Sequence, residues 1–161
     1  MSMKWGHVLL AGVIATMSMD VLTAIAIQLR VIAPLSPNVV GRWFASVARA
    51  HPFHEDIARV TPGSHELAIA VPGHYAIGMF LTALFVLVAH RIGWQAKSLS
   101  PALVFGVCTS VFPWLLMFPA MGYGFFGAHG PPGTRLFVSS LVSHVFFGLG
   151  LWIAVRMLSL T

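Results

Sequence analysis

Four long apolar runs alternate with polar segments along the chain. A helix rises about 1.5 Å per residue, so about 20 apolar residues span the roughly 30 Å of hydrocarbon in a bilayer. The pattern therefore predicts an all-α, polytopic membrane protein. We expect a single transmembrane domain, residues 1–161, in which four helices pack as one bundle. The predicted helices cover about residues 8–33, 67–90, 101–126 and 136–158.

Residues 34–66 form the only sizeable extramembrane segment between these runs. Ser36 followed by Pro37 is typical of a helix start, with an N-cap and a proline in the first turn. Four apolar residues then lie on one helical stripe: Val40, Trp43, Phe44 and Val47. Arg42 lies off this stripe. This amphipathic pattern predicts a short helix in the membrane interface. A second short helix is expected over residues 54–60.

The composition agrees with a protein that lipid covers. Hydrophobic residues make up 58% of the chain and charged residues 8%, whereas about a quarter of a soluble domain is charged. The net charge is +5, but the basic residues are scattered at the ends of apolar runs. A nucleic-acid partner would need them clustered on one face, so none is expected. The lipid bilayer is the expected partner, and another membrane protein or a second copy of the chain is a further candidate.

An even number of spans places both termini on one side of the membrane. The first run is longer than the apolar core of a signal peptide, so we expect it to be retained as a helix. The side of the termini holds Lys4, Arg91, Lys97 and Arg156. The opposite side holds Arg30, Arg42, Arg49, Arg59 and Arg135. Because the positive-inside rule gives most weight to short loops and the first helix, it favours cytoplasmic termini.

Three ionisable residues lie inside the predicted spans, where a charged side chain is costly and usually functional or paired. They are Asp20, His74 and His144, on the first, second and fourth spans. Since neighbouring spans alternate in direction, all three are expected about 10–12 Å below the same membrane surface. The sequence therefore predicts that a carboxylate and two imidazoles meet at one level. Thr16 and Ser140 share the helix faces of this cluster.

This cluster has four open interpretations. It could hold the helices together, with Asp20 bonded to one histidine and hydroxyls completing the network. Two histidines and a carboxylate also suit a divalent metal ion. Two facing histidines could hold a haem iron, the less favoured cofactor because the interior would need room for the macrocycle. Finally, Asp20 and a histidine could exchange a proton during solute movement.

A second polar group lies in the extramembrane segment and at the start of the second span. We expect His54 and Glu66 to contribute further metal ligands on the approach to the cluster, and a carboxylate at position 66 also suits a helix N-terminus. The remaining polar residues of the expected lining are Glu55, Arg42 and Arg135. The alternative is a solvated loop in which Glu55 or Asp56 pairs with Arg59.

An ordered set of short motifs resembles a family of small bacterial membrane proteins. The set comprises Met19-Asp20, Gly41-Arg42, His54-Glu55, Glu66, His74-Tyr75-x-Ile77-Gly78, Pro113, Pro119-x-x-Gly122-x-Gly124, Arg135 and His144-x-x-Phe147-Gly148. Over nearly the whole chain it is similar to the domain of unknown function 2938 family. Only the loop over residues 128–133 departs from that pattern. The resemblance implies the membrane fold, the bacterial cytoplasmic membrane and this residue list, but no activity.

The leading hypothesis is a membrane-embedded site, formed by Asp20, His74 and His144, that binds a metal ion or a small polar solute. Proton exchange is one form of this hypothesis. The first alternative is a non-catalytic accessory subunit whose polar cluster serves only packing within a larger membrane complex. The second is a metal-dependent membrane enzyme acting on an apolar substrate. No nucleophile elbow, phosphate loop or zinc-protease motif supports the enzyme, so the sequence leaves catalysis open.

Overall fold

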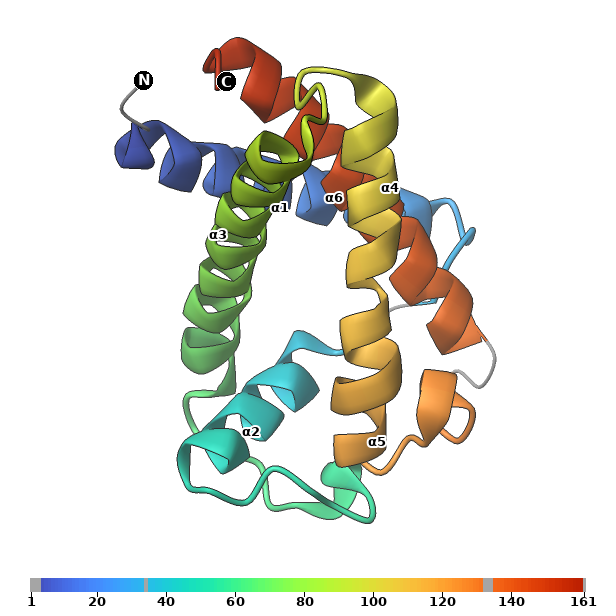
Figure 1. Cartoon of the computed structure of the whole chain (residues 1–161). Coiled ribbons are helices and arrows are strands. Elements are labelled where there is room, and N and C mark those ends of the chain that lie inside the picture. The colour runs from blue at the N-terminus through green and yellow to red at the C-terminus, as the bar shows by residue number, and fades with distance from the viewer. Residues whose placement is uncertain (1–3, 34, 132–134, 161) are drawn as a thin grey trace. The chain divides into compact units, whose positions relative to one another are not determined.

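The structure, a computed structural model, describes residues 4–33, 35–131 and 135–160, and these residues form helices and loops without a strand. Four helical segments are long and apolar enough to cross a membrane (Figure 1). They are α1 (Trp5–Gln28), α3 (Glu66–Ile92), the segment Leu99–Ala120 that begins with α4 (Leu99–Thr109), and α6 (Arg135–Met157). The all-α class is therefore confirmed, and so is the presence of four helices long and apolar enough to span a membrane.

The ends of α3 follow from its local chemistry. Glu66 stands in its first turn, and His90 and Arg91 stand in its last turn, which complements the helix dipole at both ends. The helix stops at Gly93, whose φ of 71° is left-handed. The amide of Trp94 then donates to a carbonyl of the last turn at 2.9 Å. This left-handed turn ends the helix, and glycine adopts it without steric cost.

Two of the predicted spans are too long. α1 ends at Gln28 rather than at residue 33, because Arg30 adopts a left-handed φ of 58°. The third span ends at Ala120 rather than at residue 126, because Gly122 turns the chain with a φ of 85°. Apolar side chains continue into the loops after both helices, so hydropathy alone does not show where the helices stop.

The third span changes helix type near its middle. Pro113–Met117 forms a π-helical turn (η2), in which the amide of Phe118 donates to the carbonyl of Pro113. A short helix, α5 (Phe118–Ala120), continues the span. Proline has no amide proton and disturbs the preceding turn of a helix. A π turn accommodates such a disturbance with one extra residue and is frequent at functional sites.

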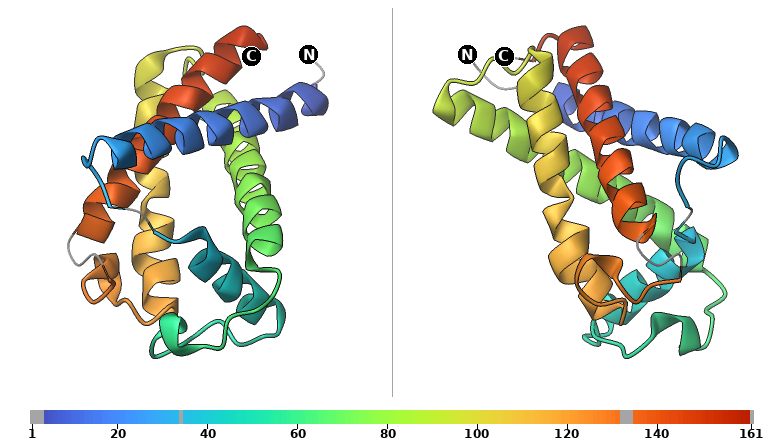
Figure 2. Two further views of the ribbon diagram at one scale, coloured as in Figure 1. Left: turned by 180° about the vertical axis from the view of Figure 1, so that it is seen from behind. Right: turned by 90° about the vertical axis from the view of Figure 1, so that its right-hand side faces the viewer.

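The chain forms two compact units, and the first contains residues 4–25, 75–109 and 141–160. Its buried core includes Val8, Ala11, Phe85, Phe147, Leu151 and Val155. Glycines allow its helices to approach closely, as small residues do in membrane proteins. A Cβ on Gly150 would lie 2.9 Å from the carbonyl oxygen of Ala15. Accordingly, both views in Figure 2 show α1 crossing α6 obliquely.

The second unit contains residues 26–33, 35–74, 110–131 and 135–140. Besides the π turn and α5, it holds α2 (Pro37–Ala48), η1 (Ile57–Arg59) and η3 (Phe125–Gly127). Its buried core includes Trp43, Ile57, Phe118, Met121 and Leu136. The helix predicted to start at Pro37 is present, and the second short helix is a 3₁₀ turn.

Three expectations about the fold stay predictions. They are the interfacial position of α2, the packing of the four spans as one bundle and the single domain. The loop that departs from the family pattern, residues 128–133, lies partly outside the described residues.

Candidate functional site

Polar side chains connect the helices of the first unit inside its apolar spans. Asp20 on α1 accepts a hydrogen bond from the hydroxyl of Tyr75 on α3. One turn further along α1, the hydroxyl of Thr23 donates to the Oγ of Ser143 on α6 at 3.0 Å. Such pairing is what makes polar groups tolerable in an apolar environment. The hydrogen bond described for Asp20 thus comes from a tyrosine, where the sequence predicted a histidine.

The imidazole of His144 on α6 is held by a hydroxyl from α4. Its Nδ1 lies 2.7 Å from the Oγ1 of Thr109, and the same hydroxyl donates to the carbonyl oxygen of Gly106 at 2.6 Å. A hydroxyl has a single proton to donate, and a carbonyl can only accept. The proton between Thr109 and His144 therefore belongs to Nδ1. In the neutral ring Nε2 is then the basic nitrogen.

We call these three hydrogen-bonded pairs the polar layer. Asp20 and Thr23 lie three residues apart on α1, and Ser143 and His144 are adjacent on α6. The layer thus joins α1, α3, α4 and α6 within the first unit, and its members are Asp20, Tyr75, Thr23, Ser143, His144 and Thr109. Three of the members, Asp20, Tyr75 and His144, are ionisable, so the layer has chemistry beyond that of hydroxyl contacts.

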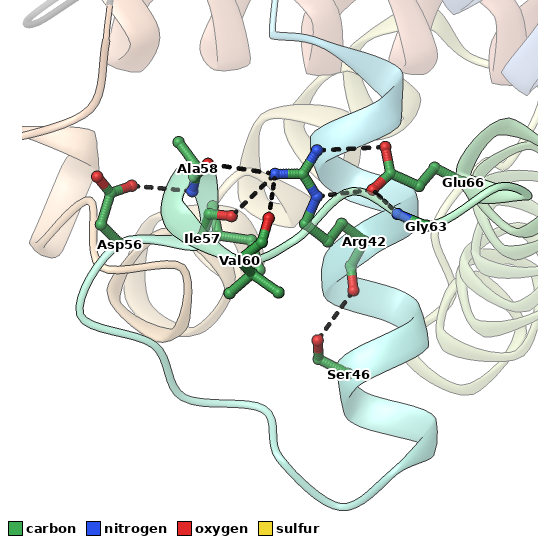
Figure 3. A network of polar contacts seen from close by, with 8 residues as sticks. All are labelled: Arg42, Ser46, Asp56, Ile57, Ala58, Val60, Gly63 and Glu66. Carbon is green, nitrogen blue, oxygen red and sulfur yellow. Dashed lines mark hydrogen bonds and ion pairs between the residues drawn. The ribbon is translucent and has the colours of Figure 1, made fainter.

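The second unit contains a buried ion pair, shown in Figure 3. The Nε of Arg42 donates to the Oε1 of Glu66 at 2.6 Å, and its Nη2 donates to Oε2 at 3.4 Å. Its Nη1 donates to the backbone carbonyls of Ile57, Ala58 and Val60, at 3.2, 3.4 and 3.0 Å. One guanidinium therefore holds the start of α3 and the loop before it against α2.

Arg42 lies off the apolar stripe of α2, yet its side chain is only 10% exposed. Burial of a guanidinium is tolerable when its donors are paired, as they are here. The Oε1 of Glu66 also accepts from the amide of Gly63 at 2.9 Å. Next to Arg42, a Cβ on Gly41 would overlap the carbonyl of Glu66. This contact set holds the loop in place and engages both carboxylate oxygens.

The expected metal ligands are divided between the two units. Asp20 and His144 belong to the first unit, whereas His74, His54 and Glu66 belong to the second. Within the part of the chain that the structure describes, no three His, Cys, Asp or Glu side chains form a group that could hold a metal ion. A metal or haem centre made of these residues stays a prediction that the described residues do not support.

The loop residues have separate roles. The amide of His54 donates to a carbonyl of α5 at 2.8 Å, and its Nε2 is buried with no partner among the described residues. The side chain of Glu55 is exposed, while a Cβ on Gly122 would overlap its carbonyl. Asp56 pairs with Arg59 at 3.4 Å. The solvated ion pair that was the alternative interpretation of this loop is therefore present.

The other expected lining residues lie at packing contacts or helix ends. The hydroxyl of Thr16 donates to its own helix at 2.8 Å, and a Cβ on Gly78 would overlap it. Ser140 is half-buried, but the bonds between segments on this part of α6 come from its neighbours Ser139 and Ser143. Arg135 is exposed at the start of α6.

Sequence reasoning did not assign Tyr75, Thr109 or Ser143 to the site, although Tyr75 stands in one of the family motifs. Two of them adjoin a chosen histidine, since Tyr75 follows His74 and Ser143 precedes His144. Apart from that motif, this adjacency is the only signal that could have found them. A hydroxyl in a helix often bonds to its own backbone, so its position in the sequence does not reveal a contact with another helix.

Four long apolar helices with paired polar groups inside them are the features of a multi-pass helical membrane protein. The chain belongs to the DUF2938 family, described as a protein of unknown function, whose model matches residues 9–158. The resemblance found in the sequence motifs is thereby confirmed. No curated protein and no solved structure matches the chain.

Proposed function

We propose that the protein is a multi-pass protein of the bacterial cytoplasmic membrane, with cytoplasmic termini, that binds a small polar solute at the polar layer and exchanges a proton with it. The observation that carries this proposal is the hydrogen-bond pattern of His144. Thr109 directs its ring proton to Nδ1, so Nε2 is the nitrogen able to accept a proton. Imidazole is the side chain whose charge changes most readily near neutral pH.

A second ionisable group of the layer complements this imidazole. A solute hydroxyl or amine donates to Nε2 of His144, and transfer of its proton gives an imidazolium that still donates from Nδ1 to Thr109. Opposite charge nearby favours a charged group, and the carboxyl group of Asp20 lies in the same layer. A carboxyl group placed in an apolar span at such cost is usually functional.

A non-catalytic accessory subunit is the second candidate, because hydrogen bonds already hold the side chains of the layer in pairs. Such pairs contribute roughly 0.6 kcal/mol on average between membrane helices. In that case the layer serves packing, and its ionisable groups have no solute to bind.

Proteoliposomes that enclose a pH-sensitive dye test the proposal. Amino acids, polyols, sugars, nucleobases and small amines are added in turn, and the internal pH is followed. We expect at least one solute to drive proton movement. The His144→Gln variant should abolish this movement, because it removes the proton acceptor, and Asp20→Asn should reduce it at least about tenfold, the effect of roughly 1.4 kcal/mol.

The matched control is Thr82→Val, since Thr82 is a buried residue of the first unit whose hydroxyl has no partner among the described residues. This variant should move protons at the wild-type rate. If no solute moves protons while Asp20→Asn and His144→Gln insert and unfold like the wild type, the proposal fails. Stoichiometric co-purification of another membrane protein would then support the accessory subunit.

A further inference from the structure

A cavity lies beside the end of α1 and the start of α6, within the second unit. Its volume is about 470 Å³, in the roughly 300–1,000 Å³ range of ligand pockets. The guanidinium-bearing residues Arg30 and Arg135 line it together with apolar residues, among them Ile27, Val31 and Val138. The cavity therefore combines positive charge with an apolar wall.

No acidic side chain neutralises these two arginines in the described structure. The ion pairs of the described residues involve other arginines, Arg42 and Arg59. Guanidinium groups match the oxygens of a phosphate or carboxylate and bind them through paired hydrogen bonds. Arg30 and Arg135 thus provide a cationic site whose anion has to come from outside the described chain.

The backbone conformation of Arg30 is unusual for an arginine, which supports a functional role for its side chain. Its φ is 58°, and its amide donates to Ile27 at 2.9 Å while the amide of Val31 donates to Ala26, also at 2.9 Å. This pattern closes a helix, and the residue at its left-handed position is usually glycine. An arginine is disfavoured there by local energetics, and residues that oppose local preference concentrate at functional sites.

Hydrogen bonds connect the backbone segments that carry the two arginines. The amide of Ala33 donates to the Oγ of Ser139 at 2.9 Å, and that Oγ donates to the carbonyl of Arg135 at 2.7 Å. The segment after Arg30 is thereby attached to the first turn of α6. A ligand that bridges the two guanidinium groups finds both backbones already in place, which lowers the entropic cost of binding.

We propose that Arg30 and Arg135 bind a phosphate group in this cavity, and that an anionic phospholipid headgroup supplies it. Both arginines lie at ends of segments apolar enough to span a membrane, where lipid headgroups are found. Val31 and Val138 of the cavity wall are 65% and 48% exposed, which suits contact with acyl chains. Basic pockets between transmembrane helices bind such headgroups. Free inorganic phosphate offers the same oxygens but does not use the apolar wall.

Native mass spectrometry of the full chain in detergent tests this inference with phosphatidylglycerol and phosphatidylcholine as probes. We expect the wild type to retain phosphatidylglycerol in preference to phosphatidylcholine. Loss of either guanidinium, in Arg30→Gln or Arg135→Gln, should weaken retention roughly fivefold, and the double variant roughly 30-fold. Arg49→Gln, which removes an exposed arginine outside the cavity, should bind like the wild type.

The Arg30→Gly variant separates binding from folding. Glycine suits the left-handed position, so this variant should unfold at or above the wild-type temperature and still lose phosphatidylglycerol. A second outcome is that phosphatidylglycerol does not bind, while inorganic phosphate at millimolar concentration stabilises the wild type but not the double variant. The two arginines would then bind phosphate, with the free anion as its source. Equal retention of phosphatidylglycerol by wild type and double variant, with no response to phosphate in either, overturns the proposal.

Discussion

Inside the apolar spans of the first unit, the hydrogen-bond partners of Asp20 and His144 are hydroxyl groups of other side chains. Asp20 and His144 could be predicted from the sequence, because an ionisable residue within an apolar run is conspicuous. Their partners Tyr75 and Thr109 could not, because the contact depends on which helices meet. Thr82 shows the difference: it is as buried as Thr109, yet its hydroxyl has no partner among the described residues.

The two buried threonines should therefore respond in opposite ways to the same substitution. Thr109→Val leaves Nδ1 of His144 without its acceptor, and an unsatisfied buried donor costs roughly 1–3 kcal/mol. Thr82→Val replaces an unpaired hydroxyl with a methyl group, so the stability should stay equal or rise. Thermal unfolding in one detergent compares the two variants. Nitrogen NMR of histidine-labelled protein should show the Nδ1-protonated form in the wild type and a changed tautomer only in Thr109→Val.

The raised pKa of Tyr123 predicts how the stability of the folded protein changes at alkaline pH. Burial raises the pKa of its hydroxyl, Asp56 raises it further and Arg42 opposes the rise. A raised folded pKa favours the neutral phenol, so this stabilisation is complete below the unfolded value of about 10 and is lost as pH rises through the folded value. Between roughly pH 9.5 and 11, the unfolding temperature of the wild type should fall more steeply than that of Tyr123→Phe. Parallel curves would contradict this assignment.

At the scale of elements, the sequence predicts helix starts better than helix ends. Pro37 marks the start of α2 because proline suits a first turn. The end of α1 at Gln28 is set by Arg30 in a left-handed conformation, which no propensity favours for arginine. The π turn at Pro113–Met117 changes the phase of the third span, so a helical wheel drawn through it assigns wrong faces. Arg42 is buried because it pairs with Glu66, which lies outside α2. The periodicity of residues along α2 therefore could not predict this burial.

The ion pair between α2 and α3 should stabilise the second unit strongly. Arg42→Met leaves the Glu66 carboxylate near-buried without its cation, and the unfolding temperature should fall by about 10 °C. The double change Arg42→Met with Glu66→Leu should lose less than either single change, because no charge is then left unpaired. Thermal unfolding measures both.

The control for that ion pair is an exposed one. Arg59→Met breaks the contact with Asp56, in which the arginine side chain is 84% exposed. Exposed pairs contribute about 0–1 kcal/mol, so its unfolding temperature should shift by no more than about 4 °C. A similar fall in Arg42→Met and Arg59→Met would refute the structural role of Arg42.

At the scale of the whole molecule, the hydropathy pattern alone predicts the four spans, because length and apolar composition decide whether a helix can cross a bilayer. The polar layer was partly predictable, since Asp20 and His144 were found and the partners Tyr75 and Thr109 were not. The proposed metal cluster required Asp20, His74 and His144 to meet, and the spacing of residues along separate helices contains no information about that distance.

Labelling of cysteines tests the four-span topology in membranes. The native Cys108 lies in the third span, so a membrane-impermeant maleimide should react with it only after the membrane is dissolved. In a Cys108→Ser background, Ser98→Cys should react from the cytoplasmic side and Ser64→Cys from the opposite side. Labelling of both from the same side would rule out the proposed arrangement of the spans.

The contacts of Arg42 have a consequence for biosynthesis. Arg42 leaves the ribosome before its acceptors at Ile57 and Val60 and 24 residues before Glu66. Until that carboxylate emerges, the cation lacks the counter-ion that it has in the folded protein and stays in water, so the nascent segment is kept from entering the lipid early. Assembly of this end of the protein therefore waits for the beginning of α3, and a later pause in translation that holds Glu66 in the exit tunnel should expose the loop that has already emerged to protease.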